Sequence, residues 1–570
     1  MLHRLFLVAA GVSSVSGILL GNSTNYQTIL EQPLVTIRNG TLAGTYNSFY
    51  HQDLFLGIPF ARPPVGYLRF QNPQPASGWN STRQATEYGD NCYGNSLMLP
   101  GFSQPVPGPM SEDCLTLNIV RPAGTEHPIP VVVWLPGGGR LEGGSRDPRW
   151  NGTFMVEESV SLRRPVMFVS INYRLGVFGQ LSGSTLKSAG VTNMGFRDQR
   201  QALFWIQENI HAFGGDKTRV TIMGESAGAG SVGLHLLAKG GVNEGLFHRA
   251  IAQSGGPLPS GPLPNMTRQD SDFALVLRNT NCTGAADPLL CLRRVPAQVL
   301  NPLSFLVAAI NSVDNDLIPA LPSQLLRENS FIKVPLLIGS NRNEGTVFIV
   351  NSINNASDLS ALITARVSPS SIPPAALSLL LETYQDPAIL TASDAGVGTV
   401  NPSPPGLQFG ALWGSATLFA SDYIIAAGRR LAARTWARNN VSCYSYFFDT
   451  PTFNVDRTTR GATHAQELPF TFGNQNAIGW ELGDPYPSNK AERTKYRALA
   501  KSIVRRWIGF VVDGDPNTFN SYDDLEWPNY DLENPRSVQF SATDGDSLQA
   551  DTWRAAAMDL LANEGLDINR

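Results

Sequence analysis

The chain has 570 residues, of which 42% are hydrophobic and 16% are charged, and its formal net charge is −4 at pH 7. This is the composition of an ordinary globular protein. A small negative net charge does not favour binding to nucleic acid or to an anionic membrane, so we expect neither as a partner. The length is compatible with one α/β domain that carries long loop insertions.

The N-terminus is typical of a secretory signal. A short basic segment ends at Arg4, an apolar stretch follows over residues 5–20, and residues 15–17 form a small-residue cleavage site. The stretch is too short and too rich in Ser and Gly for a comfortable membrane span. We predict a signal peptide over residues 1–17, with cleavage as late as residue 21 left open, and a single domain over residues 18–570. The protein would then be secreted and extracellular, with no transmembrane segment.

Glycosylation sequons and cysteines fit an extracellular chain. Five cysteines are too few for a disulfide framework, but the short loops make Cys92–Cys114 and Cys282–Cys291 the economical pairings in an oxidising compartment. Cys443 is left over in an apolar run, where a buried, inert thiol is expected. The eight N-x-S/T sequons begin at Asn22, Asn39, Asn80, Asn151, Asn265, Asn281, Asn355 and Asn440.

Strand-like and helix-like runs alternate along the chain. Continuous apolar strands separated by helices predict a large, mostly parallel central sheet that is covered by helices on both faces. The fold class is therefore α/β. The apolar strand-like runs lie at residues 115–120, 130–135, 166–173, 219–223, 334–339 and 441–448, and the helical patterns at residues 198–211, 411–439 and 491–512.

Residues 224–228 read G-x-S-x-G between a predicted strand and a predicted helix. A sharp strand-to-helix turn crowds the residues beside the serine, so glycines are needed on both sides and the Ser226 hydroxyl is left accessible. The motif also arises by chance in a chain with 53 glycines. In its strand–turn–helix context, however, it indicates acyl transfer by a serine nucleophile.

An overlapping motif offers a second interpretation. Residues 228–233 satisfy G-x-G-x-x-G, the dinucleotide-binding pattern, which also needs an acidic residue about 20 positions further on. The next strand-like run ends at Gln253 and carries no carboxylate there. The sequence therefore favours the nucleophile over the nucleotide, and we expect no metal and no organic cofactor.

A serine nucleophile needs a base and an acid that orients the base. In this elbow architecture the chain order is nucleophile, acid, histidine. Of the seven histidines, only His464 lies far enough beyond Ser226 to come from a later strand. Glu344 lies between them, on the loop after a predicted parallel strand, where such a sheet places functional groups. Without its partners, each would be read as an ordinary loop residue.

The tetrahedral intermediate of acyl transfer needs hydrogen-bond donors for its oxyanion. Gly138 and Gly139 follow a predicted strand and allow close approach of the backbone to a substrate. With the N–H of Ala227, directly after the nucleophile, they are the candidate donors. The alternative is that the glycines form only a flexible turn.

These motifs, together with four further stretches, resemble the type-B carboxylesterase family, which includes cholinesterases and several secreted fungal lipases. The resemblance runs from about residue 33 to the C-terminal region and implies an α/β-hydrolase fold, a Ser226–Glu344–His464 triad, an oxyanion hole at Gly138, Gly139 and Ala227, and a Cys92–Cys114 bridge. The four further stretches are residues 55–66, 111–119, 171–179 and 198–216.

Departures from the family pattern limit the substrate. Pro136 and Arg140 flank the glycines where relatives often have aromatic residues, and the loop between Cys92 and Cys114 has no Trp to hold choline. We therefore expect a hydrolase of carboxylic esters, acting on a small-molecule or lipid ester. The alternatives are a lipase for long-chain acylglycerols and a non-catalytic, cholinesterase-like binding protein. The sequence does not indicate the oligomeric state.

Overall fold

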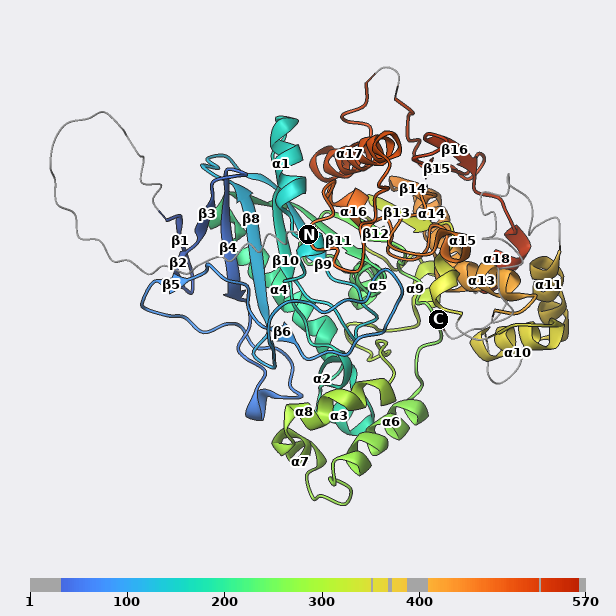
Figure 1. Cartoon of the computed structure of the whole chain (residues 1–570). Coiled ribbons are helices and arrows are strands. Elements are labelled where there is room, and N and C mark those ends of the chain that lie inside the picture. The colour runs from blue at the N-terminus through green and yellow to red at the C-terminus, as the bar shows by residue number, and fades with distance from the viewer. Residues whose placement is uncertain (1–31, 350–351, 368–371, 387–408, 522–523, 563–569) are drawn as a thin grey trace, which may run out of the picture.

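The computed structural model describes residues 32–349, 352–367, 372–386, 409–521, 524–562 and 570. The expected signal peptide and Asn22 lie outside these residues. One large sheet runs through the molecule, with helices in front of and behind it (Figure 1). Its strand order is β16-β15-β14-β13-β12-β11-β9-β10-β8-β4-β3. No described helix has both the length and the apolar character that crossing a membrane requires.

The middle of this sheet is parallel and its two edges are antiparallel. Every neighbouring pair from β10 through β15 is parallel, whereas β8, β4 and β3 on one side and β16 on the other are antiparallel to their neighbours. The strands are β3 (Thr45–Asn47), β4 (Gln52–Pro59), β8 (Thr116–Pro122), β9 (Ile129–Leu135), β10 (Met167–Ile171), β11 (Gly215–Glu225), β12 (Arg249–Gln253), β13 (Leu336–Asn341), β14 (Cys443–Phe448), β15 (Arg536–Phe540) and β16 (Ser547–Ala550).

Alternate residues of each central strand enter different cores. In β9, Val131 and Val133 belong to the cluster on one face of the sheet, and Val132 and Trp134 belong to the cluster on the other. Because both faces are covered, the strand reads as a continuous apolar run. One cluster includes side chains of α4 (Met194–Asn209), α5 (Ala227–Leu237) and α14 (Ala427–Arg438), and the other includes side chains of α1 (Thr153–Ser161), α16 (Leu468–Thr471) and α17 (Lys490–Asp513).

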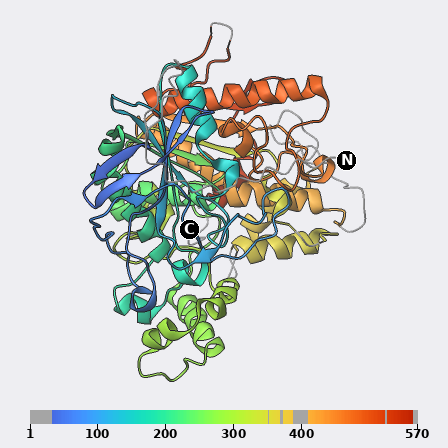
Figure 2. The ribbon, with the colours of Figure 1, turned by 60° about the vertical axis from the view of Figure 1, so that its left-hand side comes forward.

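Smaller units surround the sheet. A separate three-stranded sheet consists of β1 (Leu34–Ile37), β2 (Gly40–Ala43) and β5 (Arg83–Gln84), and β6 (Asn91–Cys92) pairs with β7 (Met110–Ser111). Figure 2 shows a helical extension that projects from the main body. The other α-helices of the described residues are α2 (Gly176–Gln180), α3 (Ser184–Ser188), α6 (Met266–Asn279), α7 (Pro288–Arg294), α8 (Ala297–Leu300), α9 (Pro322–Arg327), α10 (Ala356–Val367), α11 (Pro374–Gln385), α13 (Trp413–Ser421), α15 (Arg457–Arg460) and α18 (Ala555–Leu561).

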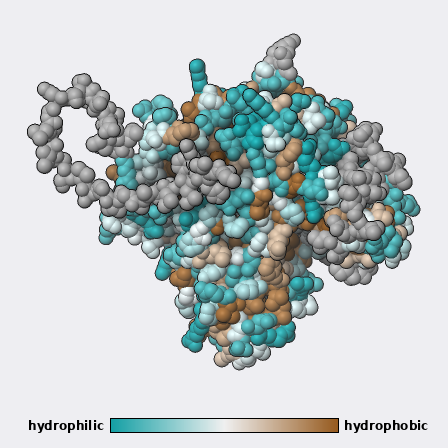
Figure 3. All heavy atoms as spheres, viewed as in Figure 1, coloured by the Kyte–Doolittle hydropathy of each residue, from teal (hydrophilic) through white to brown (hydrophobic). Residues whose placement is uncertain are grey.

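The helical extension carries exposed apolar side chains. Figure 3 shows them at the lower end of the molecule, the part formed by α6, α7 and α8. Val299 is 47% exposed and Phe305 is 56% exposed. Inside the extension, the Cys282–Cys291 disulfide lies in its own small core.

The expected elements are found with two differences. The run at residues 115–120 forms β8, which is antiparallel to β10 because no crossover helix separates β8 from β9 in the chain. The pattern at residues 411–439 is not one uniform helix, since a π-helical turn at Asp422–Ala426 separates α13 from α14. The α/β class with a large, mixed but centrally parallel sheet is confirmed.

Candidate active site

Ser226 lies at the sharp turn between β11 and α5. Its backbone is in a conformation that is rare for an L-residue, with φ 56° and ψ −122°. A Cβ atom on Gly224 would lie 2.4 Å from the backbone of Gly228, and one on Gly228 would lie 2.1 Å from the carbonyl oxygen of Leu135. Both distances are far below van der Waals contact. The two glycines are therefore required by the tight packing of this turn against β9.

The structure brings the three residues expected from the chain order into one line of contacts. His464 Nε2 lies 2.7 Å from Ser226 Oγ, and His464 Nδ1 lies 2.6 Å from Glu344 Oε2. The second carboxylate oxygen of Glu344 accepts a hydrogen bond from the N–H of Asn341, at 2.6 Å. Glu344 and His464 are buried, whereas Ser226 is partly exposed to a cavity. A base is thus held between an accessible hydroxyl and a fixed carboxylate.

Two further glutamates lie around His464, and sequence reasoning assigned them no role. Glu225 Oε1 is 3.3 Å from His464 Nε2, and Glu467 accepts a hydrogen bond from the side chain of Asn341, at 2.7 Å. Glu225 stands inside the G-x-S-x-G motif, and Glu467 follows His464 by three positions. The sequence signal for these two glutamates was their closeness in the chain to Ser226 and His464. That spacing alone does not show that the side chains of Glu225 and Glu467 are buried.

Burial and mutual charge shift the pKa values in this cluster. Burial raises the pKa of Glu225 well above its usual range, although His464 acts in the opposite direction. Burial, with help from Glu344, raises the pKa of Glu467 to about 7. Burial alone would lower the pKa of His464, but the carboxylates of Glu225 and Glu344 outweigh it and raise the value to about 9.

Backbone donors lie on the accessible side of Ser226. Gly139 and Ala227 line a cavity of about 200 Å³ together with Ser226 and His464. Gly138 is one residue further from the cavity, with φ 95°. No described residue accepts a hydrogen bond from the N–H of Gly138, Gly139 or Ala227. Of the three, Gly139 and Ala227 line the cavity itself.

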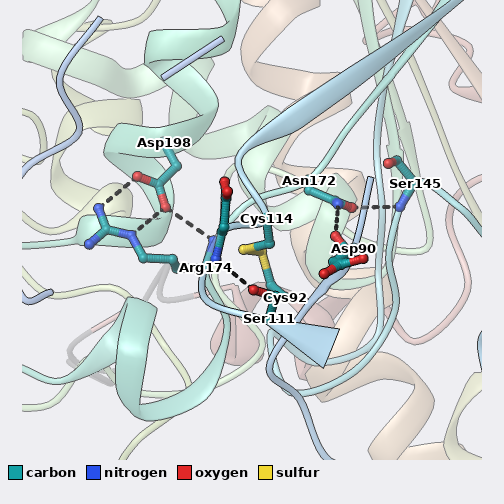
Figure 4. Close-up of a disulfide and its surroundings, with 9 residues drawn as sticks. Asp90, Cys92, Ser111, Cys114, Ser145, Asn172, Arg174 and Asp198 are labelled. Carbon is teal, nitrogen blue, oxygen red and sulfur yellow. Dashed lines mark hydrogen bonds and ion pairs between the residues drawn. A yellow bond between two sulfur atoms is a disulfide. The ribbon is translucent and has the colours of Figure 1, made fainter. Parts of the chain in front are cut away.

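The loop between Cys92 and Cys114 borders this donor group. The two sulfur atoms are bonded, and Asn172 holds the start of the loop by donating to the carbonyl oxygen of Asp90, at 3.0 Å (Figure 4). Leu97 approaches the donor group so closely that a Cβ atom on Gly139 would lie 2.7 Å from Leu97 Cδ1. Met98 is 84% exposed. The loop therefore forms a wall next to the predicted oxyanion hole.

The matched motif at residues 171–179 contributes structural support. Arg174 forms a buried, bidentate ion pair with Asp198 of α4, at 2.7 and 2.8 Å, and Figure 4 shows this pair beside the disulfide.

Cys443 is buried in β14 with no disulfide partner, and burial raises the pKa of its thiol well above the usual range. An inert structural thiol is the result. The described residues contain no cluster of side chains suited to a metal ion.

The mixed sheet, with the sharp strand-to-helix turn at Ser226, defines an α/β-hydrolase. The sequence model of the carboxylesterase family matches residues 31–555, so the chain belongs to this family. It is 33% identical to Lipase 2 of Geotrichum candidum over 91% of this chain and 92% of that protein. It is also 33% identical to acetylcholinesterase of Bungarus fasciatus, over 86% of this chain and 79% of the relative.

A solved structure agrees with the sequence comparison. EstA of Aspergillus niger superposes with a TM-score of 0.78 and 25% sequence identity, over 95% of this chain and 99% of that one. The resemblance read from the sequence motifs is confirmed. The protein is a carboxylic ester hydrolase, and esters are its substrates.

Proposed function

We propose that Ser226, His464 and Glu344 form the catalytic triad of a secreted serine esterase. The continuous contact from the Ser226 hydroxyl through His464 to Glu344 carries this proposal. A carboxylate at Nδ1 fixes the tautomer of the imidazole, so that Nε2 is free to take the hydroxyl proton. The same carboxylate stabilises the imidazolium that forms.

The reaction has two steps and needs water alone as a second reactant. Ser226 Oγ bonds to the ester carbonyl carbon while His464 takes its proton, and the oxyanion accepts hydrogen bonds from Gly138, Gly139 and Ala227. The ester C–O bond then breaks, and His464 gives the proton to the departing alcohol. Water, deprotonated by His464, attacks the acyl-enzyme. The acid is released and the Ser226 hydroxyl is restored.

Labelling with a fluorophosphonate tests the nucleophile directly. Wild type should be labelled once, at Ser226, while Ser226→Ala should lose labelling and about 10⁶ in kcat, the usual cost of removing a triad nucleophile. Ser161→Ala, on the exposed surface of α1, is the matched control and should behave as wild type. Residual turnover of Ser226→Ala within tenfold of wild type would refute the assignment. A wild-type protein that is neither labelled nor active would indicate the non-catalytic binding protein instead.

A lipase for long-chain acylglycerols is the second candidate. Relatives named lipases and the exposed Met98 favour it. Phe102 argues against a freely opening lid, because it is only 4% exposed and its ring stacks on Trp150 at a centroid distance of 6.0 Å. The loop is thus exposed at Met98 but anchored at Phe102. An esterase with a fixed pocket wall fits this loop better.

Secretion is the remaining part of the proposal. The two disulfides and the N-terminal segment support an extracellular location. Five expected glycosylation sites are exposed and two are half-buried, so each of these seven lies at the surface. The exposed ones are Asn80, Asn265, Asn281, Asn355 and Asn440, and the half-buried ones are Asn39 and Asn151.

A further inference from the structure

Arg140 places a positive charge in the cavity beside Ser226. It directly follows Gly139, and the cavity of about 200 Å³ is lined by Arg140 together with Ser226 and His464. Its backbone has φ 58°, and its carbonyl oxygen accepts a hydrogen bond from Gly176 at 2.8 Å. A Cβ atom on Gly230 would lie 3.4 Å from Arg140 Nη2. The guanidinium therefore reaches the first turn of α5, four residues beyond the nucleophile.

The structure gives the guanidinium of Arg140 no ion pair and no hydrogen bond to a described residue, and the one ionisable group that interacts with it is the phenol of Tyr173. Two other arginines with little exposure differ from it: Arg149 pairs with Asp147, at 2.7 Å, and Arg174 pairs with Asp198. The described residues that line the cavity include no Asp, Glu or Lys. The glutamates around His464 are buried and are not among the lining residues.

A neighbouring phenol does not neutralise this charge. Burial raises the pKa of Tyr173 to about 12, so its hydroxyl stays protonated, and it donates to the carbonyl oxygen of Pro136, at 2.6 Å. Arginine itself remains charged in proteins. Keeping a partly buried cation without a partner is costly, and a carboxylate is the anion whose two oxygens match the planar guanidinium fork.

We propose that Arg140 binds a carboxylate carried by the ester substrate, so that the preferred substrates are esters with a free acid group near the scissile bond. This inference rests on the proposed function. The acid group belongs either to the acyl part, as in a monoester of a dicarboxylic acid, or to the alcohol part, as in an acylated hydroxy acid. A cationic ester would be repelled by the same guanidinium, and an apolar chain would leave it unpaired.

Two pairs of probes test the charge and locate it. In the first pair the variable group lies on the acyl side: monoethyl glutarate has a free acid, and its monoamide has a neutral amide there. In the second pair, 3-acetoxypropanoate and its amide, the same two groups lie on the alcohol side. The measurement is the ratio of kcat/KM for the acid to kcat/KM for the amide. Wild type should prefer the acid by about tenfold or more in one pair, because hydrogen bonds to charged groups are the stronger kind. The pair that shows the preference identifies the side.

Arg140→Met should reduce this ratio to about one and still react with the fluorophosphonate, which shows that the active site is intact. Arg140→Lys should give an intermediate ratio, since it keeps the charge but loses the planar fork. Arg163→Met is the matched control, because Arg163 has a similar φ of 57° but lies exposed on the surface. Its ratio should equal that of wild type.

Two outcomes would overturn the inference. One is a wild-type ratio of one or less in both pairs, and the other is an unchanged preference in Arg140→Met. In either case, the proposed triad would still hold if the enzyme were labelled and cleaved the ester bond of the amide-bearing probes. Absence of both labelling and turnover in wild type would instead remove the proposed function itself.

Discussion

Two buried clusters of ionisable side chains differ in how their charges are balanced. At β16, Asp551 accepts hydrogen bonds from Arg429 at 2.5 and 2.7 Å, from Arg430 at 3.0 Å and from Tyr530 at 2.7 Å. Burial alone would raise the pKa of Asp551, but the two arginines hold it well below its usual range. Every oxygen of this carboxylate is paired, which is what a stabilising cluster requires.

The glutamates around His464 are not balanced in this way. Neither carboxylate oxygen of Glu225 has a hydrogen-bond partner among the described residues, although the side chain is only 1% exposed. The basic group that contacts Glu225 and Glu344 is the imidazole of His464. An underpaired buried cluster costs stability, and it shifts the pKa values of residues in the proposed catalytic site. The contrast indicates that charges in the β16 cluster maintain the fold, while those around His464 set protonation states.

Glu344→Gln gives the largest effect in the His464 cluster. The amide keeps the shape of the side chain, but it presents an N–H group to His464 Nδ1 and favours the wrong tautomer. We expect kcat to fall by about 10⁴, the loss typical of a neutralised triad acid, with little change in the thermal midpoint. Steady-state kinetics and a melting curve check this, with Glu382→Gln on the exposed surface of α11 as the control. A kcat near that of wild type would show that another group orients His464.

The turn at Ser226 could be read from the sequence, because the motif fixes its own local geometry. Gly224 and Gly228 are required by contacts within a few residues and with β9, and such constraints appear as glycines in the sequence. The parallel strands were also readable, since strands buried on both faces form continuous apolar runs. The direction of β8 was missed because a strand's pattern does not reveal its partner.

Features that depend on distant segments could not be predicted. Glu225 and Glu467 become a cluster only when β11 and the loop after β14 meet at His464. The pairing of Arg429 with Asp551 joins residues that are 122 positions apart. The sequence showed that Arg140 departs from the pattern of relatives. It did not show that the guanidinium lacks a carboxylate partner, because that depends on which residues line the cavity.

Asp551→Asn removes the fully paired carboxylate of the β16 cluster and should affect stability instead of chemistry. It leaves two buried guanidinium groups without their carboxylate, so we expect a loss of about 3–5 kcal/mol in the free energy of unfolding. Urea unfolding followed by tryptophan fluorescence measures this loss. Asp513→Asn is the control, since the Arg164–Asp513 pair has side chains that are 44% and 37% exposed and should contribute no more than about 1 kcal/mol.

The activity of Asp551→Asn completes this comparison. Measured at low temperature, where the variant is folded, its kcat should remain near that of wild type. If kcat fell by orders of magnitude while the urea midpoint did not move, the β16 cluster would act on the chemistry and the division between the two clusters would be wrong.

Glu225→Gln should produce the smallest effect, a shift in pH dependence. Catalysis needs neutral His464, whose pKa of about 9 is held up by Glu225 and Glu344, so kcat/KM should rise with pH from neutral into the alkaline range. Removing the carboxylate 3.3 Å from Nε2 destabilises the imidazolium and lowers this pKa. The rising limb of the profile should therefore move to lower pH, by about one unit or more. Glu225→Asp keeps the charge and should move it less. A limb that stays in place in Glu225→Gln would show that Glu225 is protonated throughout this range and does not set the pKa of His464.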